Sequence, residues 1–247
     1  MVMVGAIKER EKELFERWCG GVRTEDRSAV FVKDGLVDEE KWLTTSPRIV
    51  FVLKEAHDRD HRDFDLVRDC LGGRSTVTTW GNVARWAYGI RELWRTGEVV
   101  PYTDVRNRGV DEKQRREQLK SLCVMNISKV PGRSRTNTRN LTEKFRKFNR
   151  SYFAEQFDLY REHTDLVICC GAAVARLFLL EINPLYGYEY SPGQGAHPEG
   201  RYWYYRIEDG PYVVSVPHPQ ASIRCQEMYG KLMRTVRILK EINRNER

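Results

Sequence analysis

Polar side chains with catalytic potential follow three apolar runs of this chain. The first run leads to Glu55 and Asp58. The second leads to Asn126, and the third leads to His218. A carboxylate can orient water, an amide can donate and accept hydrogen bonds, and an imidazole can donate one to developing negative charge. Because ligands of open α/β sheets bind outside the carboxyl ends of the strands, we expect these residues to line one pocket.

A sheet is needed to position these side chains, and the apolar pattern predicts one. Nearly continuous apolar runs predict strands at residues 48–54, 122–127 and 165–170, and a hairpin at 202–207 and 212–216. Helical spacing predicts helices at residues 6–19, 80–94, 111–119, 141–161, 174–181 and 228–242. Gly20 and Gly21 should stop the first helix. The alternation implies an α/β fold, a three-layer α/β/α sandwich around a central, mainly parallel four-stranded sheet.

Length and charge limit the class of protein. The chain has 247 residues, 40% of them hydrophobic, which suits one domain over residues 1–247 with a helical N-terminal extension at 1–45. Lysine and arginine outnumber the acids 42 to 35, and the isoelectric point is about 9.1. This excess favours a polyanionic partner such as DNA. A solvated basic surface is the alternative.

The cysteines and the termini favour an ordinary cytoplasmic protein. The six cysteines form no C-x-x-C pair and no metal-ligand spacing, so we expect neither a disulfide scaffold nor a metal. The first residues are too short an apolar stretch for a signal peptide. Nothing approaches the roughly 20 apolar residues of a membrane span. We therefore expect a monomer in the cytoplasm, associated with the nucleoid.

Three motifs occur in an order typical of one enzyme family. Glu55-Ala56-His57-Asp58 comes first, Asn126 with Lys129 comes second, and His218-Pro219 comes third. This order resembles the uracil-DNA glycosylase superfamily, and most closely its Glu-Ala-Pro-Gly and His-Pro branch. The likeness covers about residues 48–237. The chain lacks the cysteine spacing with which that branch binds an iron–sulfur cluster, so we expect no cofactor.

The resemblance implies that these residues bind a flipped nucleotide and release its base. His218 would donate a hydrogen bond to a pyrimidine carbonyl oxygen, and Asn126 would pair with the base edge. Glu55 is the first candidate, and Asp58 the second, for positioning water or stabilising the cationic sugar. The alternatives are structural: a rigid His-Pro turn, an asparagine that starts a turn, and carboxylates in a charged loop.

The first motif departs from the family pattern. Ala56 stands where the best-known uracil glycosylases carry aspartate, His57 replaces proline and Asp58 replaces glycine. These changes alter the pocket floor, so His57 is a base-binding candidate and the pocket need not select uracil. Trp80 is a candidate for stacking on the flipped base, with a place in the core as its alternative.

The region after the His-Pro pair and a basic loop are the expected DNA contacts. Ile223 is expected to wedge into the duplex, with a core position as its alternative. Arg224 is expected to contact a phosphate or the orphaned partner base. Further phosphate contacts are expected from Lys129, Arg133, Arg135 and Arg139.

The function that the resemblance implies is monofunctional base excision. Water would attack the sugar after the base leaves, giving an abasic site. The substrate would be uracil or a modified pyrimidine, such as the glucosylated hydroxymethylcytosine of phage DNA, which would make the protein antiviral. A catalytically silent protein that binds abnormal DNA is the alternative. An α/β hydrolase is disfavoured, because the chain has no G-x-S-x-G elbow and no phosphate-binding loop.

Overall fold

The computed structural model describes residues 5–57, 62–67, 78–107, 112–132, 138–187, 196–199, 202–207 and 210–245. The helices are α1 (Ala6–Glu25), α2 (Glu39–Thr44), α4 (Thr78–Thr96), α5 (Tyr102–Asn107), α6 (Glu112–Lys120), α7 (Thr138–Lys144), α8 (Arg150–Asp158), α9 (Ala172–Leu177) and α10 (Cys225–Asn245). Short π or 3-10 segments are η1 (Phe145–Asn149), η2 (Arg161–His163), η3 (Phe178–Ile182) and η4 (Asn183–Tyr186). The strands are β1 (Val32–Lys33), β2 (Gly35–Leu36), β3 (Ile49–His57), β4 (Phe64–Asp65), β5 (Cys123–Gly132), β6 (Leu166–Cys170), β7 (Ala196–Glu199), β8 (Tyr202–Arg206) and β9 (Tyr212–Val216).

One mostly parallel sheet forms the centre of the molecule. Its strand order is β2-β5-β3-β6-β9-β8-β7, and the four strands β5, β3, β6 and β9 are parallel. β2 at one edge and the β8–β7 pair at the other are antiparallel to their neighbours. The α/β class and the hairpin of β8 with β9 are therefore confirmed. The predicted number of four strands is wrong, because short antiparallel strands extend both edges to seven strands among the described residues.

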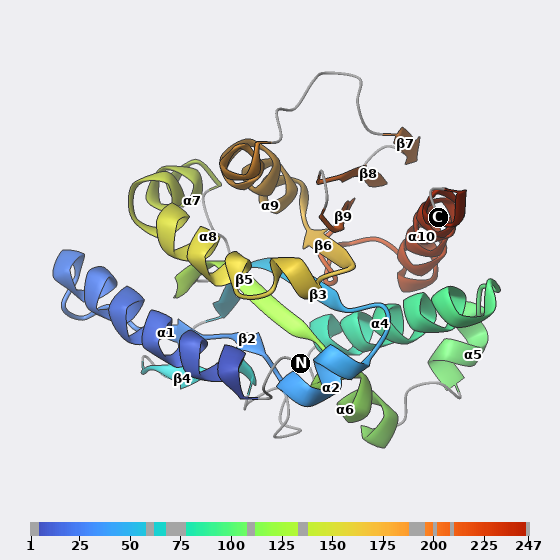
Figure 1. Cartoon of the computed structure of the whole chain (residues 1–247), viewed down its shortest axis with the longest axis horizontal. Coiled ribbons are helices and arrows are strands. Elements are labelled where there is room, and N and C mark those ends of the chain that lie inside the picture. Colours follow the sequence, from blue (N-terminus) through green and yellow to red (C-terminus); the bar gives the residue numbers. More distant parts are fainter. Residues whose placement is uncertain are drawn as a thin grey trace.

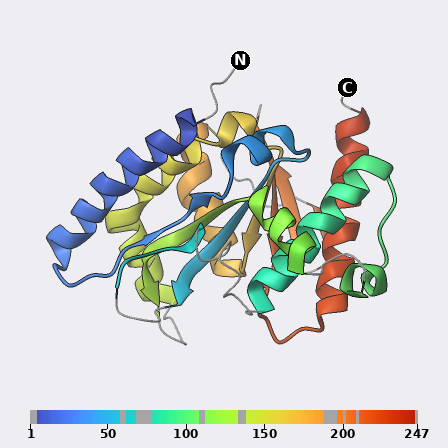
Figure 2. The same cartoon turned by 90° about the horizontal axis from the view of Figure 1, so that it is seen from below.

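Helices cover both faces of this sheet (Figure 1 and Figure 2). α1, α7, α8 and α9 lie on one face, and α4, α5, α6 and α10 lie on the other. In β3, Val52 packs toward the first group, whereas Phe51 and Leu53 pack toward the second. Both faces of the strand are buried, which explains its continuously apolar sequence. Within the described residues, no helix has the length and hydrophobicity needed to cross a lipid bilayer.

Helix α1 is longer than predicted, because it continues through Gly20 and Gly21 to its end at Glu25. Tyr152 packs so closely on Gly21 that a β-carbon there would lie 3.0 Å from the tyrosine hydroxyl. Trp18 stacks on the same ring, with 5.5 Å between ring centroids. A glycine inside a helix lowers stability by about 1 kcal/mol relative to alanine, and the packing of Tyr152 on Gly21 offsets this cost. The N-terminal helix is therefore part of the core.

Strands β3 and β5 extend further than their apolar runs predict. β3 continues through Glu55 to His57, and β5 continues past Asn126 to Gly132. The two strands pair along this extension, with Glu55 opposite Ser128 and His57 opposite Gly132. Pairing with a neighbouring strand thus holds polar residues in extended conformation. The prediction that Asn126 ends its strand is therefore wrong, because this residue lies inside β5.

Candidate active site at the carboxyl ends of the parallel strands

The helices that next follow the neighbouring strands β3 and β6 lie on opposite faces of the sheet. After β3 the chain forms the short strand β4 before α4 on one face, and after β6 it continues to α9 on the other (Figure 1). Ligands of open α/β sheets bind outside the carboxyl ends of strands at such a switch point. Gly171 follows β6 here with a φ of 115°, and a β-carbon built on it would meet no atom within 4 Å. Among the described residues, nothing therefore packs against Gly171 at the middle of this edge.

Glu55 lies on one side of the switch point, near the end of β3. Its carboxylate is packed against the backbone of Gly132, since a β-carbon there would lie 1.9 Å from Glu55 Oε1. A side chain at position 132 would displace the carboxylate. Burial raises the pKa of Glu55, and the charges of Lys54 and Lys144 partly oppose this shift. A carboxyl group with a raised pKa is suited to proton transfer near neutral pH.

His218 lies on the other side, two residues after the end of β9. Its Nδ1 accepts a hydrogen bond from the backbone N–H of Gln220 at 3.1 Å. Because Nδ1 is the acceptor, the neutral ring carries its proton on Nε2 and can donate it to a ligand. Burial lowers the pKa of His218, and the charge of Lys54 lowers it further. Both influences favour the neutral imidazole.

Lys54 affects both groups, which places Glu55 and His218 in one electrostatic environment. The same cation lowers the pKa of the carboxyl and the pKa of the imidazole. It favours the ionised form of Glu55 and the neutral form of His218. The edge thus offers a carboxyl group on β3 and an imidazole after β9, on either side of β6.

A buried asparagine holds the His-Pro loop in place. Asn82 of α4 donates from Nδ2 to the carbonyl oxygen of Pro219 at 2.8 Å. Its Oδ1 accepts from Nη1 of Arg85 at 3.1 Å, which fixes the orientation of the amide. Sequence reasoning missed Asn82. The signal that could have found it is a polar residue on the apolar face of an amphipathic helix, one turn before the buried Trp86.

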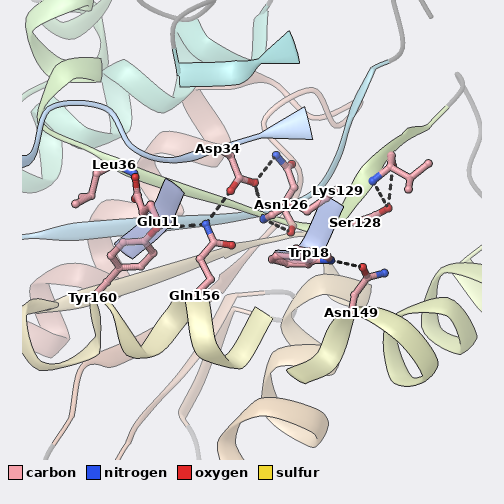
Figure 3. Close-up of polar contacts among 11 residues, drawn as sticks. Glu11, Trp18, Asp34, Leu36, Asn126, Ser128, Lys129, Asn149, Gln156 and Tyr160 are labelled. Atoms are coloured by element: carbon pink, nitrogen blue, oxygen red, sulfur yellow. Dashed lines mark hydrogen bonds and ion pairs between the residues drawn. The ribbon is translucent and has the colours of Figure 1, made fainter. Parts of the chain in front are cut away.

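Asn126 and Lys129 are interior residues, and both contact Asp34 (Figure 3). The Asn126 side chain shares the α4 face with Val124, yet the residue is only 1% exposed. Lys129 points to the opposite face and is wholly buried, with its Nζ 2.7 Å from Asp34 Oδ2. The prediction that Lys129 contacts DNA phosphates is therefore wrong, because its ammonium group is buried and cannot reach a phosphate. Its positive charge is instead paired inside the protein.

The surroundings of Lys129 form a buried polar cluster that the sequence did not predict. The ammonium lies 4.6 Å from the ring centroid of Trp18, and burial lowers its pKa while Asp34 opposes that shift. Tyr160 donates to Glu11 at 2.5 Å in the adjoining part of the cluster, where burial raises the pKa of both groups. These contacts join segments that are far apart in sequence, so no local sequence pattern predicts them.

Trp80 and Ile223, the candidates for base stacking and for the DNA wedge, differ in how far they are buried. Trp80 is 7% exposed and belongs to the core beneath α4, so the packing alternative describes it better than stacking on a base. A ring needs a free face to stack, and the core covers this one. Ile223 is half-buried and packs against the same core. A wedge role would use only its remaining exposed surface.

The remaining candidates lie at the surface or outside the described residues. His57 and Arg224 are exposed, and Arg139 is exposed with an ion pair to Glu143 at 3.1 Å. Three candidates fall outside the described residues, namely Asp58, Arg133 and Arg135. The structure therefore places Glu55 and His218 at the same edge of the sheet, on strands that flank β6, and it places Lys129 on the opposite face from Asn126.

The groups at this edge that can bind a ligand are a carboxyl, an imidazole and, beneath them, an amide. No group of three or more His, Cys, Asp or Glu side chains in the described parts of the chain is arranged to hold a metal ion. Comparison with models of protein families and with curated proteins gives no match to this chain.

Proposed function

We propose that this protein is a monofunctional DNA glycosylase that removes uracil or a modified pyrimidine and leaves an abasic site. The observation that carries the proposal is the hydrogen bond from Gln220 N–H to His218 Nδ1. It leaves Nε2–H as the donor of a neutral imidazole at the ligand-binding edge of the sheet. A carboxyl group, Glu55, shares that edge and the electrostatic influence of Lys54.

Each group has a distinct part in the proposed reaction. The bond between the sugar C1′ and the base nitrogen breaks, and its electron pair leaves with the base. His218 Nε2–H stabilises the negative charge that develops on a pyrimidine carbonyl oxygen. The Glu55 carboxylate stabilises the cationic sugar and orients water. The water oxygen bonds to C1′, and Glu55 accepts the proton that the water releases.

The substrate in this proposal is either uracil or a larger, modified pyrimidine. Ala56 is buried and supplies no acid, so Glu55 is the candidate carboxylate of the described part of β3. The changed first motif, with His57 and Asp58 in place of the family's proline and glycine, supports a base with a bulky substituent, such as glucosylated hydroxymethylcytosine in phage DNA. Removal of such a base would act against phage infection.

DNA binding in this proposal rests on charge and on exposed cations. The net formal charge is +7, and Arg224 lies exposed just beyond His218. Arg139 is a second exposed cation. The protein would act as a monomer at the nucleoid in the cytoplasm. Helices on both faces of the sheet support the three-layer α/β/α sandwich that belongs to this proposal.

Incubation with defined DNA tests the proposal. Single-stranded and duplex oligonucleotides carrying uracil, hypoxanthine or glucosylated hydroxymethylcytosine are treated with the protein and then with alkali, which cleaves abasic sites. We expect cleavage at one pyrimidine, and none with the His218→Ala variant on the same time scale. Tight binding of these strands without an abasic product on any of them would support the silent DNA-binding alternative.

A further inference from the structure

The carboxylate of Asp34 holds the Asn126 amide in one orientation (Figure 3). Asp34 Oδ2 accepts from the backbone N–H of Asn126 at 2.7 Å and from its side-chain Nδ2 at 3.1 Å. The same oxygen lies 2.7 Å from Lys129 Nζ, which also donates to the Asn126 carbonyl oxygen at 3.0 Å. Asn126 is therefore fixed at its backbone and at its side chain by one buried ion pair.

A flipped amide does not fit beside this carboxylate. Asp34 Oδ1 accepts from Gln156 Nε2 at 2.8 Å, so both of its oxygens act as acceptors, as in an ionised carboxylate. Turning the Asn126 amide over would place Oδ1 against Asp34 Oδ2, an oxygen that has no proton to donate. Two buried acceptors facing each other lose a hydrogen bond and repel. The Asn126 Nδ2 must therefore face Asp34.

This leaves Asn126 Oδ1 and one N–H for other partners. Among the described residues, the hydrogen bonds of the Asn126 side chain engage Nδ2 and not Oδ1. The side chain lies on the α4 face, as Glu55 does, because Asn126 pairs with Leu53 and Glu55 is two residues beyond Leu53. The orientation that Asp34 imposes thus fixes the positions of Asn126 Oδ1 and of the remaining Nδ2–H on that face.

We propose that Asp34 is a specificity-determining residue, because it fixes the amide that reads the base edge. The inference rests on the proposed glycosylase function. A uracil-type edge offers a carbonyl acceptor beside an N3–H donor, whereas a cytosine-type edge offers an amino donor beside an N3 acceptor. An amide with one fixed orientation pairs with one of these orders and opposes the other. Asp34 therefore sets the preference between the two classes of pyrimidine, although it touches neither.

The Asp34→Ala substitution tests this inference. It removes the carboxylate oxygen that accepts from Asn126 Nδ2, so both orientations of the Asn126 amide become possible. We expect the ratio of single-turnover release rates for uracil and for a hydroxymethylated cytosine to fall at least tenfold, mainly because the disfavoured base is released faster. The matched control is Gln156→Leu, which removes the partner of the other Asp34 oxygen. It should leave the ratio within threefold of the parent.

The outcomes separate this inference from the proposed function. An unchanged ratio in a folded Asp34→Ala variant, with base release by the parent, overturns the role of Asp34 and leaves the glycosylase function intact. If the parent releases no pyrimidine, the proposed function fails, and the specificity role fails with it. If the single variant does not fold because Lys129 is left unpaired, the double variant with Lys129→Met removes the buried charge, and the ratio is measured on it.

Discussion

Strand β5 contributes to two regions that differ in how far their charged side chains are buried. On the α1 face, Lys129 is sealed from solvent and paired with Asp34. Three residues further along, Gly132 lies against the half-buried Glu55 at the open end of the sheet. Alternation of side chains along the strand separates the two settings, since adjacent residues point to opposite faces. The position of a charged residue along its strand thus decides whether its side chain faces the buried core or the open end of the sheet.

The largest effect is expected from removing the buried cation. Lys129→Met leaves the Asp34 carboxylate buried without its ammonium partner, which typically costs about 3–5 kcal/mol. We expect the free energy of unfolding, measured by urea denaturation, to fall by that amount. Arg139→Gln, which alters an exposed cation of the same predicted basic loop, is the matched control and should have no measurable effect. Equal midpoints for Lys129→Met and the parent would show that the ion pair does not support the core.

The next effect is expected at the open end of the sheet, in activity and not in stability. His218→Ala removes the Nε2–H donor, and loss of a donor to developing charge lowers rates by about 10²–10³-fold. Single-turnover base release should fall by at least two orders of magnitude, with little change in DNA affinity or unfolding midpoint. A rate within threefold of the parent would remove His218 from the site.

A smaller loss is expected from filling the space beside Glu55. In Gly132→Ala the new β-carbon would lie 1.9 Å from Oε1, so the carboxylate must move. Displacement of a catalytic group by about 1 Å can cost up to 10²-fold, so we expect base release to drop by about 10- to 100-fold. Gly20→Ala is the control, because its β-carbon would meet no atom within 4 Å. Equal activity of the parent and Gly132→Ala would mean that the position of Glu55 does not matter.

The smallest effect is a displacement of the pH profile. Activity needs neutral His218 and ionised Glu55, so it falls as the pH drops through either pKa. Lys54 lowers both pKa values, and Lys54→Gln should therefore raise both and move the acid limb of single-turnover release to higher pH. The rate on the plateau above that limb should change little. A limb that stays in place, or moves to lower pH, would disconnect Lys54 from the two groups.

The parallel part of the fold could be predicted because its strands are buried on both faces and carry continuous apolar runs. The short strands β1 and β2 could not, because they have two residues each and show no period. The extension of β3 through Glu55 depends on pairing with β5, which a local pattern does not contain.

The location of the candidate residues could be predicted only in part, for a related reason. Glu55 and His218 follow apolar runs, so their sequence positions indicate the carboxyl edge. Asp34 and Lys129 are 95 positions apart, and their contact depends on tertiary folding. Asn82 was missed because it reaches the His-Pro loop from a helix that sequence reasoning treated as core. Residues that support a site from a distance are therefore the part that a single sequence reveals least.

The most direct test of the account is single-turnover base release by Glu55→Gln on the pyrimidine that the parent removes best. Glutamine keeps the shape of the side chain but can neither accept the proton of water nor offset the charge of the sugar. We predict a rate lower by about 10²–10⁴-fold, the range for loss of a general base, with DNA affinity within threefold of the parent. Release at the parent rate, with DNA still bound, would contradict the assignment of this edge as the active site.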